Sequence, residues 1–320
     1  MSIEIAEIAP LSQRILAEVE LAIVGKRAVL KDIMAAVLAD GHVLLEDFPG
    51  LGKTLLAKSF AAALGLEFKR IQFTPDLLPG DITGGYIYNR DKSAFELRPG
   101  PIFANVILAD EINRASPKTQ SALLEAMQEH QVTLEGETMA LPSPFLVLAT
   151  QNPIEYEGTF PLPEAQLDRF IMKLSIGYPS ADDEQEILRR RRERQRDEVR
   201  LTQVTHAAQV LAMRQAVETV YVDPDLERYM VALVSETRRD RRIAVGASPR
   251  GSLALLKLSR ARAAMEGRSY VIPDDVKHFA RNALSHRLIL EPELWMRRSA
   301  AEEIIGQIVE SVPVPVLKES

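Results

Sequence analysis

The chain has 320 residues and a formal net charge of −6 at pH 7, and its 46% hydrophobic and 26% charged residues are ordinary for a soluble globular protein of about two domains. It contains no cysteine, which excludes disulfides, thiolate zinc sites and cysteine nucleophiles, and its five histidines lack the spacing of a metal site. The absence of a long apolar run or a signal-peptide pattern predicts a cytoplasmic protein without a membrane span, and the acidic charge disfavours broad nucleic-acid binding.

A buried strand, Val43–Leu45, leads into a glycine-rich loop that opens a helix over Leu55–Leu64. Backbone N–H groups of such a loop converge on phosphate oxygens, and the positive end of the helix adds to the attraction. We expect Lys53 to reach the β- and γ-phosphates and the Thr54 hydroxyl to bind Mg²⁺. Asp47 stands where the pattern G-x-x-x-x-G-K-[ST] has its first glycine, so the shape of the loop is left open. The loop residues expected to contact the nucleotide are Pro49, Gly50, Leu51, Gly52, Lys53, Thr54 and Leu55.

Further along, the apolar run Val106–Ala109 ends in two acids, Asp110 and Glu111. This pattern indicates a buried parallel strand, and ligand sites in open α/β sheets lie at the carboxyl ends of such strands. Asp110 is therefore expected to hold Mg²⁺ directly or through water, and Glu111 to act as the general base that polarises the attacking water. For this motif alone, a strand that ends in two solvated acids is the simpler alternative.

Residues 1–178 alternate strand-like runs with helical patterns, which indicates an α/β domain whose parallel sheet is covered by helices on both faces. Residues 179–320 read as helices only, and we expect a linker helix followed by a small all-α domain. Two stretches of the first domain, near 84–98 and 131–141, are predicted to be projecting hairpins, although an extra sheet edge without a role fits equally well. The predicted strands of the sheet are Val43–Leu45, Phe68–Phe73, Val106–Ala109, Phe145–Thr150 and Ile171–Ile176.

Three polar residues outside these motifs are candidates for the chemistry. Asn152 follows the fourth predicted strand and is placed to orient the attacking water or contact the γ-phosphate, unless it only forms an Asn-Pro turn. Arg169 ends a short helix and fits either a contact to the transition state on a neighbouring subunit's nucleotide or a surface ion pair. Arg250 follows Ser248 and Pro249 at the start of a long helix, where an unpaired cation is unfavourable unless an anion lies nearby.

Two arginine-rich stretches have no role in these motifs. The run at 189–196 follows the acids of 182–184 on one predicted helix, and this order of charges favours a solvated linker helix over a nucleic-acid surface. The cluster at 238–242 precedes Arg250, and the sequence leaves open whether it borders the nucleotide or a subunit interface.

Taken together, these residues resemble an AAA+ ATPase. The runs Ala-Asp-Glu-Ile-Asn-Arg-Ala at 109–115 and Gln-Ser-Ala-Leu-Leu-Glu-Ala-Met-Gln-Glu at 120–129 are similar to those of the MoxR family in particular. The resemblance covers nearly the whole chain and implies that Val24 and Gly25 border the adenine. It further implies that Asn152 is the sensor 1 residue, that Arg250 is the sensor 2 residue of a helical lid, and that Arg169 is an arginine finger acting in trans.

The resemblance also implies a function: an Mg²⁺-dependent ATPase that binds ATP and ADP and forms a homo-oligomer, usually a hexameric ring. Hydrolysis is expected to shift the lid against the core and to drive chaperone-like remodelling, assembly or activation of a protein complex, with the hairpins conveying the movement to the client. In similar proteins a von Willebrand factor A domain protein is often encoded nearby, which makes such a protein a candidate partner. Three alternatives stay open, namely the motor subunit of a metal-chelatase-like complex, a nucleic-acid motor, and a nucleotide-gated binding switch with little turnover.

Overall fold

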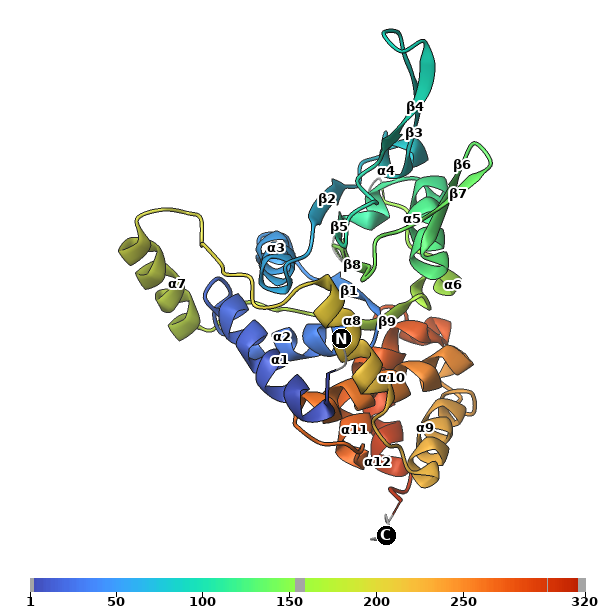
Figure 1. The fold of residues 1–320 in the computed structure, drawn as a ribbon. Coiled ribbons are helices and arrows are strands. Elements are labelled where there is room, and N and C mark those ends of the chain that lie inside the picture. Colours follow the sequence, from blue (N-terminus) through green and yellow to red (C-terminus); the bar gives the residue numbers. More distant parts are fainter. Residues whose placement is uncertain (1–2, 153–158, 298, 316–320) are drawn as a thin grey trace.

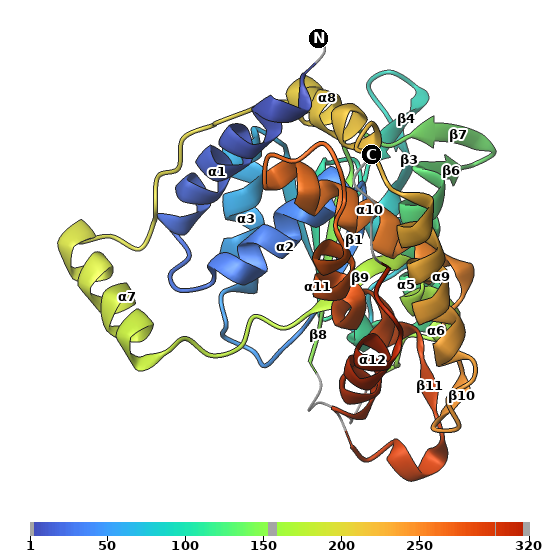
Figure 2. The same cartoon turned by 90° about the horizontal axis from the view of Figure 1, so that it is seen from below.

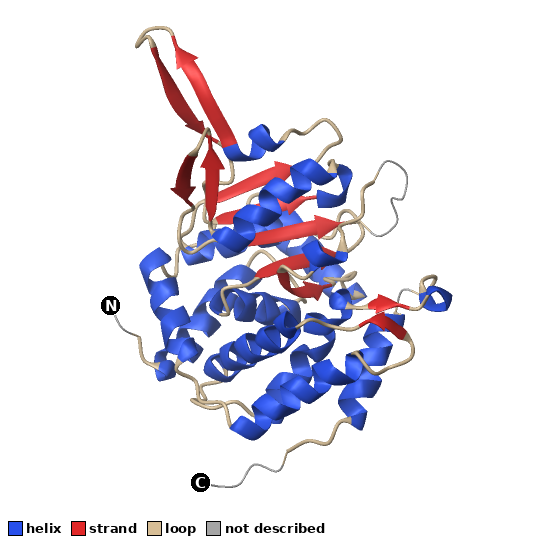
Figure 3. Ribbon diagram, turned by 90° about the vertical axis from the view of Figure 1, so that its right-hand side faces the viewer, coloured by secondary structure: helices blue, strands red, loops and turns tan. Residues whose placement is uncertain are grey.

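A five-stranded parallel sheet with the strand order β2-β5-β8-β1-β9 lies at the centre of the first part of the chain (Figures 1 and 3). The computed structural model describes residues 3–152, 159–297 and 299–315. The sheet confirms the predicted α/β class, and each strand begins and ends within two residues of its predicted range. Its strands are β1 (His42–Glu46), β2 (Phe68–Gln72), β5 (Val106–Asp110), β8 (Leu146–Gln151) and β9 (Phe170–Leu174).

Helices cover both faces of this sheet, as the composition of its two apolar cores shows. Val43 and Leu45 of β1 belong to a large core, whereas Leu44 between them belongs to a smaller one. Successive side chains of a strand point to opposite faces, so the two cores lie on opposite sides of the sheet. The large core is built with α1 (Ile5–Glu20), α2 (Arg27–Leu38) and α3 (Lys53–Leu64), and the smaller one with α4 (Pro79–Thr83) and α5 (Pro117–Glu129).

Two antiparallel hairpins project from the end of the molecule that carries β2, and both were predicted (Figure 1). The first presents exposed apolar side chains, Ile87, Tyr88 and Phe95, of which Phe95 is 70% exposed. The Tyr86 hydroxyl donates a hydrogen bond of 2.6 Å to Glu137 Oε2, and this contact joins the two hairpins. Their strands are β3 (Gly84–Asn89), β4 (Ala94–Pro99), β6 (Gln131–Leu134) and β7 (Glu137–Ala140).

The C-terminal part is helical, as predicted, apart from a small antiparallel sheet of β10 (Ile243–Val245) and β11 (Ile289–Leu290). Strands of two and three residues are too short for an alternating pattern to reveal them in the sequence. Short 3₁₀ helices span Ile112–Arg114, Ser285–Arg287 and Pro292–Leu294. The longer elements are α7 (Ala181–Arg194), α8 (Ala207–Glu218), α9 (Pro224–Thr237), α10 (Pro249–Met265), α11 (Pro273–Leu284) and α12 (Ala300–Ser311), and α6 (Glu164–Leu167) precedes β9.

Helix α7 projects from one side of the molecule, whereas α8 to α12 gather against the face that carries α1 and α2 (Figures 1 and 2). No residue of α7 is buried. Its Arg189 forms ion pairs with Glu186 at 2.6 Å and Glu193 at 2.7 Å, which agrees with a solvated linker helix. Among the described residues, no helix is long and apolar enough to cross a membrane.

Candidate nucleotide site

The loop between β1 and α3 has the backbone of a phosphate-binding loop. Gly50 and Gly52 have φ angles of +84° and +77°, which side-chain-bearing residues rarely adopt, so glycine is needed at both positions. The helix begins at Lys53, and its free N–H groups face the loop. Lys53 Nζ donates to the Asp47 carbonyl oxygen at 2.7 Å. Burial lowers the pKa of Lys53, although the carboxylates of Asp47, Asp110 and Glu111 oppose this effect.

The carboxylates of Asp110 and Glu111 lie at the carboxyl end of β5 and are held by neighbouring strands. The Thr150 hydroxyl on β8 donates to Asp110 Oδ1 at 2.7 Å and accepts the Glu111 N–H at 2.8 Å. On the other side, β2 provides Arg70, which contacts Asp110 Oδ2 at 2.6 Å, and Gln72, which donates to Glu111 Oε2 at 2.9 Å. Neither β2 residue was singled out in the sequence, although two polar side chains two positions apart on a strand indicate one shared face.

A cavity of about 480 Å³ joins the loop to these carboxylates. Lys53, Thr54, Asp110, Glu111 and Asn152 all line it, so the structure brings the residues predicted from three separate segments into one site. The Thr54 hydroxyl and the Asp110 carboxylate are hard oxygen donors of the kind that Mg²⁺ prefers. The described residues hold no group of three or more potential metal-binding side chains, and Mg²⁺ at a nucleotide needs only one or two carboxylates besides the phosphates.

A second cavity, of about 200 Å³, continues from the other side of the glycine loop. Its lining is mostly apolar and includes Val24, Leu55, Ile176 and Ile187, with Ile187 contributed by α7. An apolar slot next to a phosphate site suits the flat face of a nucleotide base. Gly25, which was predicted together with Val24, does not line this cavity. Its φ is +72°, and an added Cβ would lie 2.1 Å from Asp183 Cγ, so Gly25 lets α7 approach closely.

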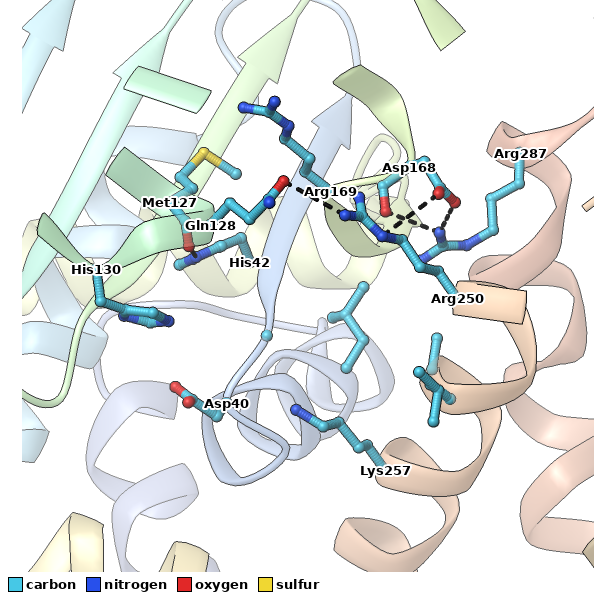
Figure 4. Close-up of a pocket in the computed structure, with 14 residues that line it drawn as sticks. Asp40, His42, Met127, Gln128, His130, Asp168, Arg169, Arg250, Lys257 and Arg287 are labelled. Atoms are coloured by element: carbon cyan, nitrogen blue, oxygen red, sulfur yellow. Dashed lines mark hydrogen bonds and ion pairs between the residues drawn. The ribbon is translucent and has the colours of Figure 1, made fainter. Parts of the chain in front are cut away.

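Four cations surround a third cavity, of about 270 Å³, at the opposite edge of the sheet, where β1 and β9 begin. They are Arg169, Arg250, Lys257 and Arg287 (Figure 4). Neither Arg169 nor Arg250 lines the cavity around Lys53. The two predicted arginines are therefore brought together with each other, and away from the phosphate loop of their own chain.

Asp168 organises this cluster. The side chain of Arg287 is almost completely buried, and its guanidinium contacts the Asp168 carboxylate and donates to the Asp168 carbonyl oxygen at 2.8 Å. Ser248 Oγ, whose residue caps α10 as predicted, donates to Asp168 Oδ2 at 3.0 Å. Arg250 Nε lies 3.8 Å from the same oxygen, so an anion does accompany the cation at this helix start. In Figure 4 the Arg169 side chain points away from the pair formed by Asp168 and Arg287.

The other stretches singled out in the sequence lie elsewhere. In the cluster at 238–242, Arg239 pairs with Glu236 at 2.7 Å and Arg242 with Asp240 at 2.6 Å, and none of the cluster lines the three cavities described above. Pro153, which follows Asn152 in the predicted turn, falls outside the described residues.

Comparison with known proteins gives two matching family models. Residues 42–172 match the ATPase family associated with various cellular activities (AAA), and residues 235–308 match the AAA lid domain. A crystal structure of a protein from Cytophaga hutchinsonii superimposes with a TM-score of 0.90 at 40% identity, covering 97% of this chain and 96% of that one.

Two relatives align over almost the full length. YeaC of Bacillus subtilis is 49% identical over 97% of each chain. Chaperone MoxR1 of Mycobacterium tuberculosis is 42% identical over 95% of this chain and 82% of its own. With the parallel sheet, the phosphate loop and the helical lid, these matches show that the chain belongs to the MoxR family of AAA+ ATPases.

Proposed function

We propose that this protein hydrolyses ATP to ADP and phosphate in an Mg²⁺-dependent reaction at the cavity around Lys53. The phosphates would lie on the glycine loop and the base in the apolar cavity beside Val24. Thr54 and Asp110 would hold the Mg²⁺, which neutralises charge on the phosphate oxygens when bound.

Glu111 is the residue that would activate water as general base, with Asn152 beside it in the same cavity. Glu111 has a φ of 56°, a conformation that costs free energy for a residue with a side chain. Its N–H bond to Thr150 and its side-chain bond to Gln72 hold it there. Such a costly conformation, fixed by surrounding contacts, fits a residue whose carboxylate must face the phosphates rather than the solvent.

The separation of Arg169 and Arg250 from their own phosphate loop is the observation that supports a shared site. The two cations lie at the amino ends of the strands and the loop lies at the carboxyl ends. A second copy of the chain, bound head to tail, would bring this cationic face to its neighbour's γ-phosphate, and repeated head-to-tail contacts close into a ring. Family resemblance favours a hexamer.

We further propose that the hairpins act on a protein client, together with a von Willebrand factor A domain partner of the kind the resemblance suggests, so that hydrolysis serves remodelling or assembly. The exposed Ile87, Tyr88 and Phe95 offer an apolar contact surface, and the Tyr86 to Glu137 bond couples one hairpin to the other. The name of the Mycobacterium tuberculosis relative, a chaperone, supports this proposal.

The test of the shared site is a mixing experiment on ATP hydrolysis with Mg²⁺. Glu111→Gln and Arg169→Ala are each expected to retain below about 1% of wild-type activity. When the two are co-expressed in equal amounts, one site in four combines an intact Glu111 with a neighbour's intact Arg169, so about a quarter of the wild-type activity should return.

The matched control mixes Glu111→Gln with Lys53→Ala, whose defects lie in the same cavity. Each chain in that mixture lacks one residue of its own cavity. No site can therefore be complete, even where the neighbour contributes an intact Arg169, and no activity should return. Failure of the first mixture to regain activity would show that Arg169 does not act across a subunit boundary. Wild-type protein that does not hydrolyse ATP would refute the proposed function itself.

A further inference from the structure

The departure of Asp47 from the phosphate-loop pattern has a structural explanation. Asp47 directly follows β1 and does not have a positive φ, so the backbone at this position has no need of glycine. The side chain leaves the loop, and the residue is 4% exposed. A carboxylate that is nearly inaccessible to solvent must find hydrogen-bond donors inside the protein.

Those donors all belong to the segment that leaves the sheet after β9. The Ser175 hydroxyl donates to Asp47 Oδ1 at 2.7 Å, the Gly177 N–H donates to the same oxygen at 3.2 Å, and the Ile176 N–H donates to Oδ2. All three groups donate, so they fill acceptor positions on both oxygens of the carboxylate. Asp47 thus links two segments that are about 130 residues apart in the sequence.

The same residue also touches the phosphate side of the site. Its carbonyl oxygen accepts the hydrogen bond from Lys53 Nζ, while Ile176 and Gly177, which its carboxylate holds, line the apolar cavity for the base. The segment continues to Tyr178, whose carbonyl oxygen accepts from Lys26 Nζ at 2.8 Å. One buried residue therefore lies between the phosphate loop and the wall of the base cavity.

We propose that Asp47 is a positioning residue that aligns the base cavity with the phosphate loop, so that loss of its carboxylate weakens the binding of a base-bearing nucleotide but not of a bare phosphate chain. This inference rests on the proposed use of the site for ATP. Under this proposal, loss of the carboxylate lowers the affinity for a base-bearing nucleotide, whereas the loss of its charge alone would raise that affinity. The carboxylate acts on Lys53 electrostatically, so its removal should favour any anion at the loop, whether or not that anion carries a base.

The experiment measures dissociation constants of the full-length chain for ADP and for inorganic pyrophosphate by calorimetry in Mg²⁺-containing buffer. In Asp47→Asn the amide offers one acceptor oxygen and turns an N–H₂ donor toward the donors of the segment after β9. The dissociation constant for ADP is expected to rise about tenfold, while that for pyrophosphate stays within about twofold or falls.

Two further variants keep the test decisive. Ser175→Ala removes one donor and preserves the carboxylate, so it should shift the ratio of the two constants in the same direction by a smaller factor. Asp32→Asn is the matched control, because Asp32 is also buried and accepts hydrogen bonds, from His278 at 2.7 Å and from Asn282 at 3.4 Å, but lies between α2 and α11. It should leave the ratio unchanged.

The outcomes separate the two proposals. If wild-type protein binds both ligands and Asp47→Asn changes both constants by the same factor, Asp47 acts only through charge or general stability and the positioning role is refuted, whereas the nucleotide site stands. If wild-type protein binds neither ligand, the proposed function fails, and this inference fails with it.

Discussion

The buried His42 ring should make the stability of this protein depend on pH. His42 begins β1, where Nδ1 accepts the Val147 N–H at 3.1 Å. The proton of the neutral ring therefore lies on Nε2, which donates to the Met127 carbonyl oxygen at 3.0 Å. Burial lowers the pKa of His42 to about 4, because the charged ring would lose its hydration without gaining a buried anion.

The size of the effect follows from the difference between the folded and unfolded pKa values. In the unfolded chain a histidine has a pKa of about 6.5, so between that pH and about 4 the unfolded state takes up a proton that the native state does not. The free energy of unfolding therefore falls as the pH drops through this window. The pKa difference corresponds to about 3 kcal/mol, and below pH 4 this residue contributes no further change.

The assay is urea unfolding at several pH values from 7 to 4, on wild type and on His42→Gln, which keeps an amide donor and acceptor but does not titrate. Other titrating groups, including the buried His286, are present in both proteins and cancel in the comparison. Between pH 7 and pH 4, wild type should lose about 3 kcal/mol more than the variant. Parallel stability curves for the two proteins would refute the reasoning.

Two other substitutions, each paired with a control variant, test the lid and the cationic cluster. Asp275, which is 1% exposed, binds Arg268 at 2.8 Å and Arg262 at 3.1 Å, so Asp275→Asn should lower the free energy of unfolding by about 3 kcal/mol. Glu218→Gln, which breaks an exposed pair with Arg260, should cost less than about 1 kcal/mol in the same chemical denaturation. Arg250→Ala should reduce kcat by about 100-fold or more with ADP affinity unchanged, whereas Arg239→Ala, at an exposed ion pair, should match wild type in steady-state hydrolysis. An equal loss in both arginine variants would contradict a specific role for Arg250.

Much of the candidate nucleotide site could be predicted from the sequence because its signals are local. One buried strand ends in Asp110 and Glu111, and another leads into the glycine loop before Lys53. Each of these two motifs lies within about a dozen residues of sequence. Parallel strands bring their carboxyl ends to one edge, so these separate motifs had to meet once the sheet formed. The five strands follow from short apolar runs, and the two hairpins from local alternation on either side of a polar turn.

The contacts that could not be predicted join residues far apart in the sequence. In the sequence, Asp47 only stands where the phosphate-loop pattern has a glycine. Its hydrogen bonds with Ser175 and Gly177 are visible only in the folded chain, because the local sequence around each of the three residues does not indicate its partner. Arg70 likewise lies 40 residues from Asp110, and only the pairing of β2 with β5 makes them neighbours. Such pairs are determined by strand order and by the path of loops, which periodicity does not encode.

The position of Arg250 is likewise determined by contacts between residues far apart in the sequence, and it affects how the proposed ring would work. Helices α10 and α11 share one apolar core with α1 and α2, and α11 also contacts β9. Polar contacts reinforce this packing, because Arg287 is buried against Asp168 and Lys31 pairs with Glu266 at 3.0 Å. Moving the lid against its own core, as the sequence led us to expect, would expose that shared apolar surface at a cost of about 25 cal/mol per Å². In the proposed ring the less costly movement lies between copies, where Arg169 and Arg250 of one chain, which line the same cavity, would follow the γ-phosphate of the next.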